Sequence, residues 1–333
     1  MAQMVEQLIR NQQVAGSSPA ISSMKNARER VFCFPVPCKI HFLRGFMKLT
    51  DLSVIRSLLG EEGTSFKKKF GQNFLINESV VERIAESCLP DIPDPDEKLG
   101  VLEIGPGIGV LTQKLSPIAH KVVAVEIDTT LLPILDKTLA DCPNVTVVNN
   151  DILKVDLAAL VAEQFADCTR LAVCANLPYY ITTPILMALL ESRLPFSSIT
   201  VMVQKEVADR LCAPAGSANY GAITATLSYY GAPRRLFIVN AGNFVPAPKV
   251  DSAVVQIKLH TAPPVQVHSE DKLFAVIKAA FGQRRKTLAN ALSSLPNVSK
   301  EQIAAAIAGA GLSPTVRGEA LTLAQFAQIA NLL

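Results

Sequence analysis

Tryptophan is absent from this sequence of 333 residues, and aromatic residues make up only 6% of it. The seven cysteines include no Cys-x-x-Cys pair, and their odd number leaves at least one thiol unpaired. Neither a disulfide framework nor a zinc site is therefore expected. We instead expect buried free thiols in a reducing compartment, at the cysteines that lie in or beside apolar segments: Cys88, Cys142, Cys168, Cys174 and Cys212.

Long apolar runs and excess charge are also missing. No stretch reaches the roughly 18 apolar residues that a membrane-spanning helix needs, so no membrane contact is expected. Charged residues make up 18% of the chain, and the formal net charge is only +3. A nucleic-acid binder that relies on overall charge would be more basic, so any such contact must come from local patches. Hydrophobic residues, at 49%, suffice for one large domain and a smaller one.

Residues 1–46 show neither helical nor strand periodicity. Their basic residues outnumber the two acids, Glu6 and Glu29, as in a transit peptide. The stretch from Val5 to Pro19 instead resembles a translated transfer-RNA gene, because its Gly-Ser-Ser-Pro can be encoded by the conserved T-arm. We interpret residues 1–46 as a non-native or disordered extension, and our hypothesis is that the natural chain begins at Met47.

From Met47 onward, short apolar runs alternate with helical patterns. Five runs are expected to be buried strands: Val101–Ile104, Val122–Val125, Val145–Val148, Leu171–Ala175 and Ile199–Val203. This alternation predicts an α/β fold with a doubly wound, Rossmann-like parallel sheet and helices on both faces.

Two later apolar runs, Arg235–Val239 and Ala253–Leu259, are close enough in sequence to form an antiparallel pair at one edge of the sheet. The dipeptide Pro263-Pro264 follows them and resembles a domain boundary. We predict one domain over residues 47–261 and a small all-helical C-terminal domain over residues 262–333.

A glycine-rich turn follows the first predicted strand. Residues Glu103 to Gly109 read Glu-Ile-Gly-Pro-Gly-Ile-Gly, and a strand followed by such a turn and a helix is typical of nucleotide binding. Glycines let the backbone turn sharply and approach a ligand closely. The spacing differs from the Gly-x-Gly-x-x-Gly of nicotinamide dehydrogenases, because Val110 takes the last position. From the turn alone, three interpretations stay open: a methyltransferase, a dehydrogenase and a turn with only a structural role.

Acidic residues end the next two strands. Glu126 can accept hydrogen bonds from both ribose hydroxyls of a nucleoside, whereas Asp128 better fits the start of a helix. Asp151 can accept from an adenine amino group, although alone it would more often cap a helix. Because ligands of open α/β sheets bind at the carboxyl ends of the strands, these acids and the glycine turn together predict a nucleoside site.

The motif Asn176-Leu177-Pro178-Tyr179 follows the fourth strand. The amino group of adenine is a poor nucleophile, because its lone pair is delocalised into the ring. The Asn176 amide oxygen and the Leu177 carbonyl can accept the amino hydrogens and aim the lone pair at a methyl donor. Pro178 stiffens the turn, and Tyr179 offers a flat face for a base drawn out of its helix. The alternative is an ordinary turn.

Five motifs in order resemble the bacterial ribosomal RNA small-subunit adenine dimethyltransferase family, from about Phe66 to the C-terminus. They are Gly71–Leu75, Glu103–Gly107, Asn176–Tyr179, Phe244–Ser252 and Phe281–Lys286. The resemblance implies a class I methyltransferase fold that uses S-adenosylmethionine and no metal. It also implies a cytoplasmic enzyme that dimethylates N6 of two adjacent adenosines in a hairpin near the 3′ end of 16S rRNA. No obligate protein partner is evident.

The resemblance assigns roles to individual residues. It implies that the cofactor contacts Asn73, Leu75, Gly105, Gly107, Glu126, Asp151 and Asn176. In this assignment Asn73 and Leu75 close over the methionine part, Glu126 holds the ribose and Asp151 holds the adenine. Asn176 spans cofactor and target, and Phe244 forms the second wall of the target-base pocket beside Asn176–Tyr179.

Two basic clusters are expected to bind RNA phosphates, namely Lys67-Lys68-Lys69 and Arg284-Arg285-Lys286. Their alternative is a solvated face. The first cluster lies beside the expected cofactor entrance, and the second lies in the C-terminal helices. These positions favour phosphate contacts.

Three other functions remain to be weighed. A large-subunit ribosomal RNA adenine methyltransferase of the macrolide-resistance type shares the catalytic motifs, but Phe281–Lys286 and the C-terminal domain favour the small-subunit enzyme. A non-catalytic ribosome-assembly factor would be expected to have lost the glycine turn or Asn176, and both are intact. The glycine spacing and the Asn176–Tyr179 motif disfavour a dehydrogenase.

Overall fold

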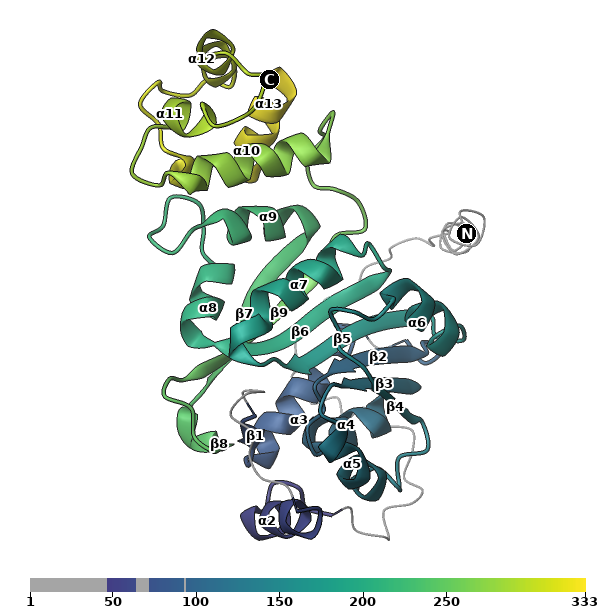
Figure 1. The fold of residues 1–333 in the computed structure, drawn as a ribbon. Coiled ribbons are helices and arrows are strands. Elements are labelled where there is room, and N and C mark those ends of the chain that lie inside the picture. Colours follow the sequence, from purple (N-terminus) through teal and green to yellow (C-terminus); the bar gives the residue numbers. More distant parts are fainter. Residues whose placement is uncertain (1–46, 64–71, 93) are drawn as a thin grey trace, which may run out of the picture. The chain divides into compact units, whose positions relative to one another are not determined.

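Seven strands form one sheet in the order β4-β3-β2-β5-β6-β9-β7 (Figure 1). The structure is a computed structural model that describes residues 47–63, 72–92 and 94–333. Strands β2 to β6 pair in parallel, and β9 pairs antiparallel with both β6 and β7. The doubly wound sheet and the antiparallel edge pair are thus confirmed. The strands are β2 (Leu99–Ile104), β3 (Lys121–Glu126), β4 (Val145–Asn149), β5 (Arg170–Asn176), β6 (Phe196–Gln204), β7 (Gly231–Val239) and β9 (Ser252–Leu259).

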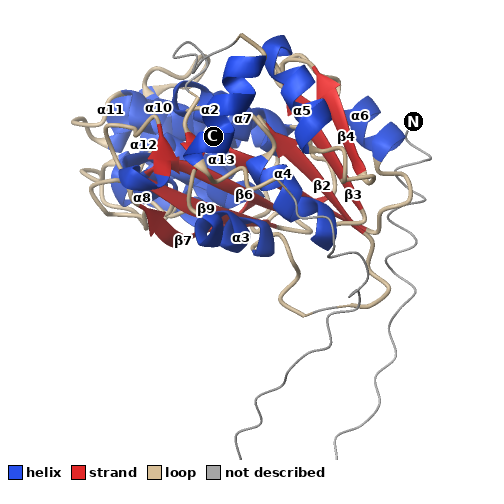
Figure 2. Cartoon of the chain, turned by 90° about the horizontal axis from the view of Figure 1, so that it is seen from below, coloured by secondary structure: helices blue, strands red, loops and turns tan. Residues whose placement is uncertain are grey.

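Helices cover both faces of the sheet (Figure 2). Side chains alternate along a strand, so Val101 and Leu102 enter different hydrophobic cores. The helices of the α/β part are α2 (Leu52–Glu61), α3 (Glu78–Glu86), α4 (Val110–Leu115), α5 (Leu132–Thr138), α6 (Leu157–Gln164), α7 (Thr182–Glu191), α8 (Lys205–Leu211) and α9 (Ala222–Tyr230). Helices α2, α3 and α4 share the core of Val101, whereas α6 to α9 share that of Leu102.

Strand β4 departs from the prediction. Residues 145–148 are only half-buried, so the expectation of a fully buried strand is wrong there. The reason is its place in the sheet, since β4 is an edge strand with β3 as its single neighbour. Its cover on one face is the small cluster of Leu135, Leu139 and Cys142.

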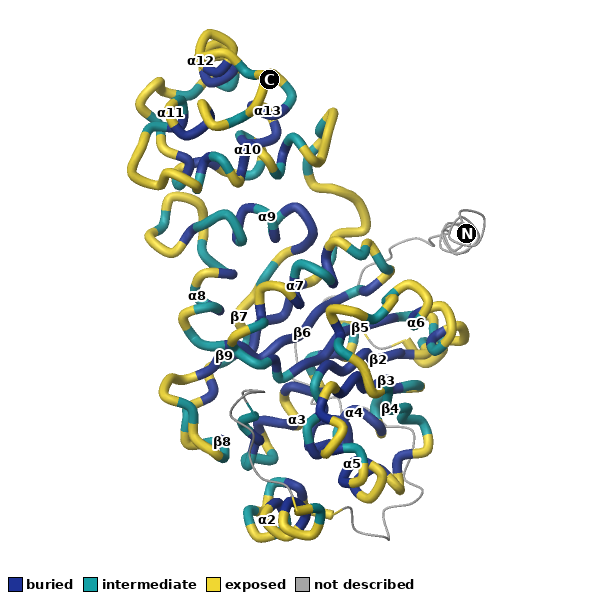
Figure 3. The backbone as a smooth tube through the Cα atoms, in the orientation of Figure 1, coloured by how far each residue is buried: buried dark blue, intermediate teal, exposed yellow. Residues whose placement is uncertain are grey.

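The C-terminal region is helical, as predicted. Its helices are α10 (Glu270–Gly282), α11 (Leu288–Leu292), α12 (Lys300–Gly309) and α13 (Leu323–Leu332). Their inner faces are buried and their outer faces exposed (Figure 3). Tyr230 of α9 stacks on Phe274 of α10, with the ring centroids 5.7 Å apart. The division of the chain at residues 261 and 262 stays a prediction.

Several expectations lie outside the described residues, namely those for residues 1–46 and for Lys67, Lys68 and Lys69. The five cysteines in the described ranges are free thiols, as expected; Cys168 and Cys212 are half-buried and the other three are buried. None of the helices in these ranges combines the length and apolar character that a bilayer crossing requires.

Candidate functional site

A cavity lies at the carboxyl ends of the parallel strands. Its lining includes residues 72–75, the turn 103–107, and residues 125–127, 150–152 and 176–181. These segments come from five separate parts of the chain. The cavity therefore brings together all seven residues that the sequence assigned to the cofactor, and with them Leu177, Pro178 and Tyr179.

The glycine turn needs its glycines. Gly105, Gly107 and Gly109 have φ values of 68°, 61° and 89°, a region that other residues rarely adopt. A Cβ on Gly107 would also lie 2.8 Å from the Phe74 ring. The turn is tied to the next strand, because the Gly105 N–H donates to the Val125 carbonyl at 3.0 Å. Backbone atoms therefore form this wall of the cavity.

Glu126 is buried at the end of β3, only 4% exposed. Its Oε2 accepts from the Gly107 N–H at 3.2 Å, and its Oε1 accepts from the Asp128 N–H at 2.8 Å. Burial raises the pKa of this carboxyl, and the two N–H groups partly oppose the shift. Asp128 caps the short helix that follows, accepting from the Thr130 N–H at 3.1 Å, which confirms its expected role.

Asp151 lines the cavity and also stabilises a turn. Its Oδ1 accepts from the Leu153 N–H at 3.1 Å, and its Oδ2 lies 3.7 Å from Lys154 Nζ. This contact does not make Asp151 a helix cap, because the next helix, α6, is capped by Asp156. A carboxylate accepts several hydrogen bonds, so the contact leaves capacity for a ligand.

Asn176 ends β5, and its Nδ2 donates to the Asn73 carbonyl at 3.2 Å. In the described part of the chain no partner is found for Asn176 Oδ1, which makes the oxygen the atom that a ligand can use. The Leu177 N–H donates to the Met202 carbonyl at 3.3 Å and fixes the turn. The Tyr179 hydroxyl and Ser252 Oγ lie 2.6 Å apart. Burial raises the pKa of Tyr179, so its hydroxyl is neutral at physiological pH.

Residues Gln72–Leu75, called the strap here, cover one side of the cavity. Two of them form β1 (Phe74–Leu75), which pairs with β8 (Phe244–Val245) in a small second sheet. The Ile76 N–H donates to the Asn243 carbonyl at 2.9 Å. A chain segment far away in sequence thus holds the strap in place.

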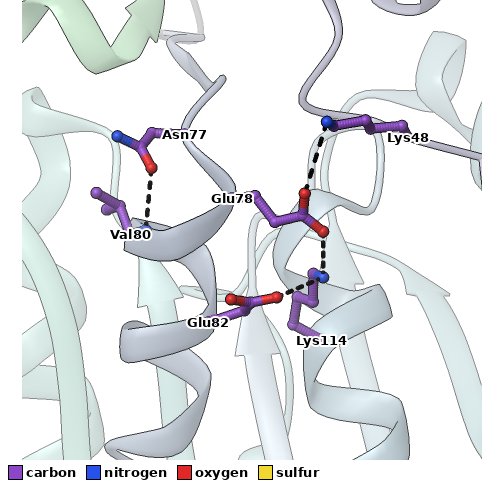
Figure 4. A network of polar contacts seen from close by, with 6 residues as sticks. All are labelled: Lys48, Asn77, Glu78, Val80, Glu82 and Lys114. Carbon is purple, nitrogen blue, oxygen red and sulfur yellow. Dashed lines mark hydrogen bonds and ion pairs between the residues drawn. The ribbon is translucent and has the colours of Figure 1, made fainter.

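The strap leads into α3, which is fixed by polar contacts (Figure 4). Asn77 caps the helix by accepting from the Val80 N–H. Lys114 of α4 donates to Glu78 at 2.7 Å and to Glu82 at 2.9 Å. The contact with Lys114 lowers the pKa of Glu78, so this link persists at neutral pH and weakens in acid.

Phe244 is not brought into the cavity. Its side chain is 2% exposed and packs in the core that contains Phe74 and Leu75. Among the described residues that line the cavity, Phe244 is missing. The structure places it behind the strap, where it pairs with Leu75.

The C-terminal basic cluster lies away from the cavity lining. Arg284, in the turn after α10, donates to Glu319 of the short helix Gly318–Ala320 at 2.9 Å and also to the Ala218 carbonyl. Arg285 and Lys286 are exposed, and neither forms an ion pair with any residue that the structure describes. Arg284 is exposed as well but is already paired with Glu319, which leaves Arg285 and Lys286 as the members of the cluster without an ion pair in the described ranges.

Glu103 is a cavity residue to which the sequence assigned no role of its own. It is 1% exposed, and its Oε2 has no hydrogen-bond partner within the described ranges. Burial raises its pKa to about 8, the Thr112 hydroxyl nearby opposes the shift, and the charge of Glu126 adds to it. An acid inside the otherwise apolar run Leu99–Ile104 was the available signal.

Comparison with known proteins decides the family. The family model described as ribosomal RNA adenine dimethylase matches residues 63–333. The chain belongs to this family. The dimethylase is 49% identical over 281 residues to the ribosomal RNA small subunit methyltransferase A of Anoxybacillus flavithermus, covering 84% of this chain and 94% of that one. It is 51% identical over 271 residues to the protein of that name from Lachnoclostridium phytofermentans, covering 80% and 91%.

Two solved structures resemble the dimethylase in fold. The 23S rRNA methyltransferase ErmE matches with a TM-score of 0.60 at 24% identity, over 78% of this chain and 99% of that one. A dimethyladenosine transferase from Plasmodium falciparum matches with a TM-score of 0.62 at 24% identity, over 77% and 95%. The dimethylase therefore has the class I methyltransferase fold that the sequence predicted.

Proposed function

We propose that this dimethylase transfers methyl groups from S-adenosylmethionine to N6 of two adjacent adenosines near the 3′ end of 16S ribosomal RNA. The observation that carries the proposal is the setting of Asn176, whose amide nitrogen is held by Asn73 while its oxygen stays available at the cavity. The named small-subunit relatives, about half identical to this chain, support the small subunit as substrate. With this substrate we propose a cytoplasmic enzyme.

The cavity residues fit S-adenosylmethionine. The Glu126 carboxylate suits two ribose hydroxyls, and Asp151 suits an exocyclic adenine amino group. The glycine backbone at Gly105 and Gly107 would leave room for the methionine part, and Asn73 and Leu75 of the strap would hold it from the other side. When bound, the cofactor supplies a methyl group already activated by its sulfonium. The chemistry proposed here requires no metal. Separately, the described ranges contain no group of three or more His, Cys, Asp or Glu side chains that could hold a metal ion.

The protein's part in the reaction is to position the target base. Asn176 Oδ1 and the Leu177 carbonyl accept the two amino hydrogens, which turns the nitrogen lone pair toward the methyl donor. Tyr179 stacks on the base and is fixed by its bond to Ser252. Positioning of this kind contributes up to roughly 7–11 kcal/mol in well-oriented reactions. The amino group then loses a proton to solvent.

The C-terminal helices are proposed to bind RNA as a separate domain over residues 262–333. The exposed pair Arg285 and Lys286 supports this role, because such side chains neutralise phosphates. The cluster Lys67-Lys68-Lys69, which lies outside the described residues, is proposed to do the same.

The proposed function is tested by incubating unmethylated small subunits with labelled S-adenosylmethionine and mapping the modified bases. We expect label at two adjacent adenosines of 16S rRNA. Label confined to large-subunit RNA would instead identify an enzyme of the macrolide-resistance type. Binding of subunits without any label would identify an assembly factor.

We expect Glu126→Ala to weaken cofactor binding by about 10-fold to 100-fold, since a hydrogen bond to a charged group contributes about 1.5–3 kcal/mol. Calorimetric titration with S-adenosylhomocysteine measures this loss. A cofactor analogue without ribose hydroxyls provides the control. The parent and Glu126→Ala should bind this analogue with the same weak affinity. Equal affinities of parent and variant for S-adenosylhomocysteine would remove Glu126 from the site.

We expect the double variant Arg285→Ala/Lys286→Ala to bind small subunits more weakly and with a flatter salt dependence. Each lost phosphate contact changes the log–log slope by about 0.7–0.9. Lys300→Ala, an exposed lysine at the start of α12, is the matched control. Arg284→Ala should mainly lower stability, because that side chain is bound to Glu319. If the plots of log affinity against log salt are parallel for the double variant and the parent, Arg285 and Lys286 are only solvated surface residues.

A further inference from the structure

Tyr180 presents an exposed aromatic ring at the cavity. It is 61% exposed, whereas the other four tyrosines are buried or half-buried. No other Phe or Tyr ring in the described ranges is exposed. An exposed ring at a binding cavity offers a flat face on which a nucleic-acid base can stack.

The backbone around Tyr180 is firmly held. The Pro178 carbonyl accepts from the Ile181 N–H at 3.2 Å and from the Thr182 hydroxyl at 3.3 Å. The preceding Tyr179 is anchored to Ser252 through its hydroxyl. The Tyr180 hydroxyl, by contrast, has no hydrogen-bond partner among the residues that the structure describes. The backbone that carries Tyr180 is therefore held at the cavity, whereas its exposed side chain forms no hydrogen bond within the described ranges.

A base that enters the cavity leaves its neighbour in the RNA strand without a stacking partner. An aromatic ring at the rim can replace that partner, and base–aromatic stacking is favourable for every base. We propose that Tyr180 stacks on the base next to the target adenosine, outside the cavity, and keeps the strand open during transfer. The inference rests on the proposed function, in which the neighbouring base is the second target adenine.

The first test compares Tyr180→Leu with Tyr180→Phe in single-turnover methylation of unmethylated small subunits. We expect Tyr180→Leu to lower kcat/KM by about 5-fold to 150-fold, the range that corresponds to the loss of one stacked base. Tyr180→Phe keeps the ring and should match the parent. Ile92→Ala removes another exposed apolar side chain, 83% exposed in the loop before β2, and should leave the rate unchanged. Cofactor affinity should be the same in all four proteins.

The second test removes the base instead of the ring. Subunits are reconstituted on RNA that carries an abasic residue next to the remaining target adenosine. The parent should lose rate on this RNA by the same factor, and Tyr180→Leu should lose nothing further. Three outcomes would each overturn the inference. The rate losses caused by Tyr180→Leu and by the abasic residue could multiply, the rate of Tyr180→Leu could equal that of the parent, or Tyr180→Leu could lose cofactor affinity by the same factor as rate. A parent enzyme that methylates no adenosine would instead overturn the proposed function.

Discussion

Asn176→Ala is expected to slow the methyl-transfer step by about 100-fold to 1,000-fold, the usual cost of removing one preorganised polar group from an active site. Of the bound RNA the side chain would contact only the target base, so RNA binding should stay close to that of the parent. Single-turnover methylation separates the two effects. A variant rate equal to that of the parent would make Asn176 a turn residue only.

Asn144→Ala is the matched control for the loss of an asparagine. Its amide group donates to the carbonyls of Ser116 and Ala119, both at 2.8 Å, and does not line the cavity. This control should lower the melting temperature without slowing transfer. Asn176→Asp adds a sharper comparison, because it places a carboxylate oxygen against the Asn73 carbonyl in place of a donor. It should therefore be slow and should also loosen the strap.

Glu103→Gln is expected to stabilise the protein, with the gain growing as the pH rises from about 4.5 to 8. The folded-state pKa of Glu103 is raised to about 8 by burial, so the folded chain holds a proton that the unfolded chain releases. Stability from this group is fully present below pH 4.5 and is lost as the pH rises toward 8. A shift of this size corresponds to about 4–5 kcal/mol over the whole window.

Chemical denaturation at several pH values measures this effect. The unfolding free energy of the parent should fall relative to that of Glu103→Gln between pH 5 and 8, and the two should converge in acid. Glu301→Gln, on the exposed start of α12, should follow the parent across this window. Parallel curves for Glu103→Gln and the parent would show that Glu103 titrates normally.

The sequence predicted the edge of the sheet that carries the site, because each motif directly follows an apolar strand. Carboxyl ends of parallel strands meet, so the glycine turn, Glu126, Asp151 and Asn176 had to lie together. The strap was harder to predict. Strands of two residues have no periodicity, and the bond from Asn176 to Asn73 joins positions 103 apart in sequence.

Phe244 was predicted from its motif to form a wall of the target-base pocket, and the described cavity lining does not include it. Its motif contacts the strap as a strand, and pairing with Leu75 turns the ring into the core. Tyr180 is the opposite case, since its neighbour Tyr179 was the predicted stacking residue. Consecutive residues of a turn face different surroundings, and only the fold shows that one is anchored and the other exposed.

The β1–β8 pair has a consequence for synthesis on the ribosome. Asn77 donates to Asn243 Oδ1 at 2.8 Å, across 166 positions of sequence. Closing so long a loop is slow and requires most of the sheet to be in place first. A nascent chain that ends before β8 already contains the glycine turn, Glu126 and Asn176, but β1 of its strap lacks its partner strand. We therefore expect the wall of the cavity formed by β1 to be complete only after β8 has emerged and paired with it.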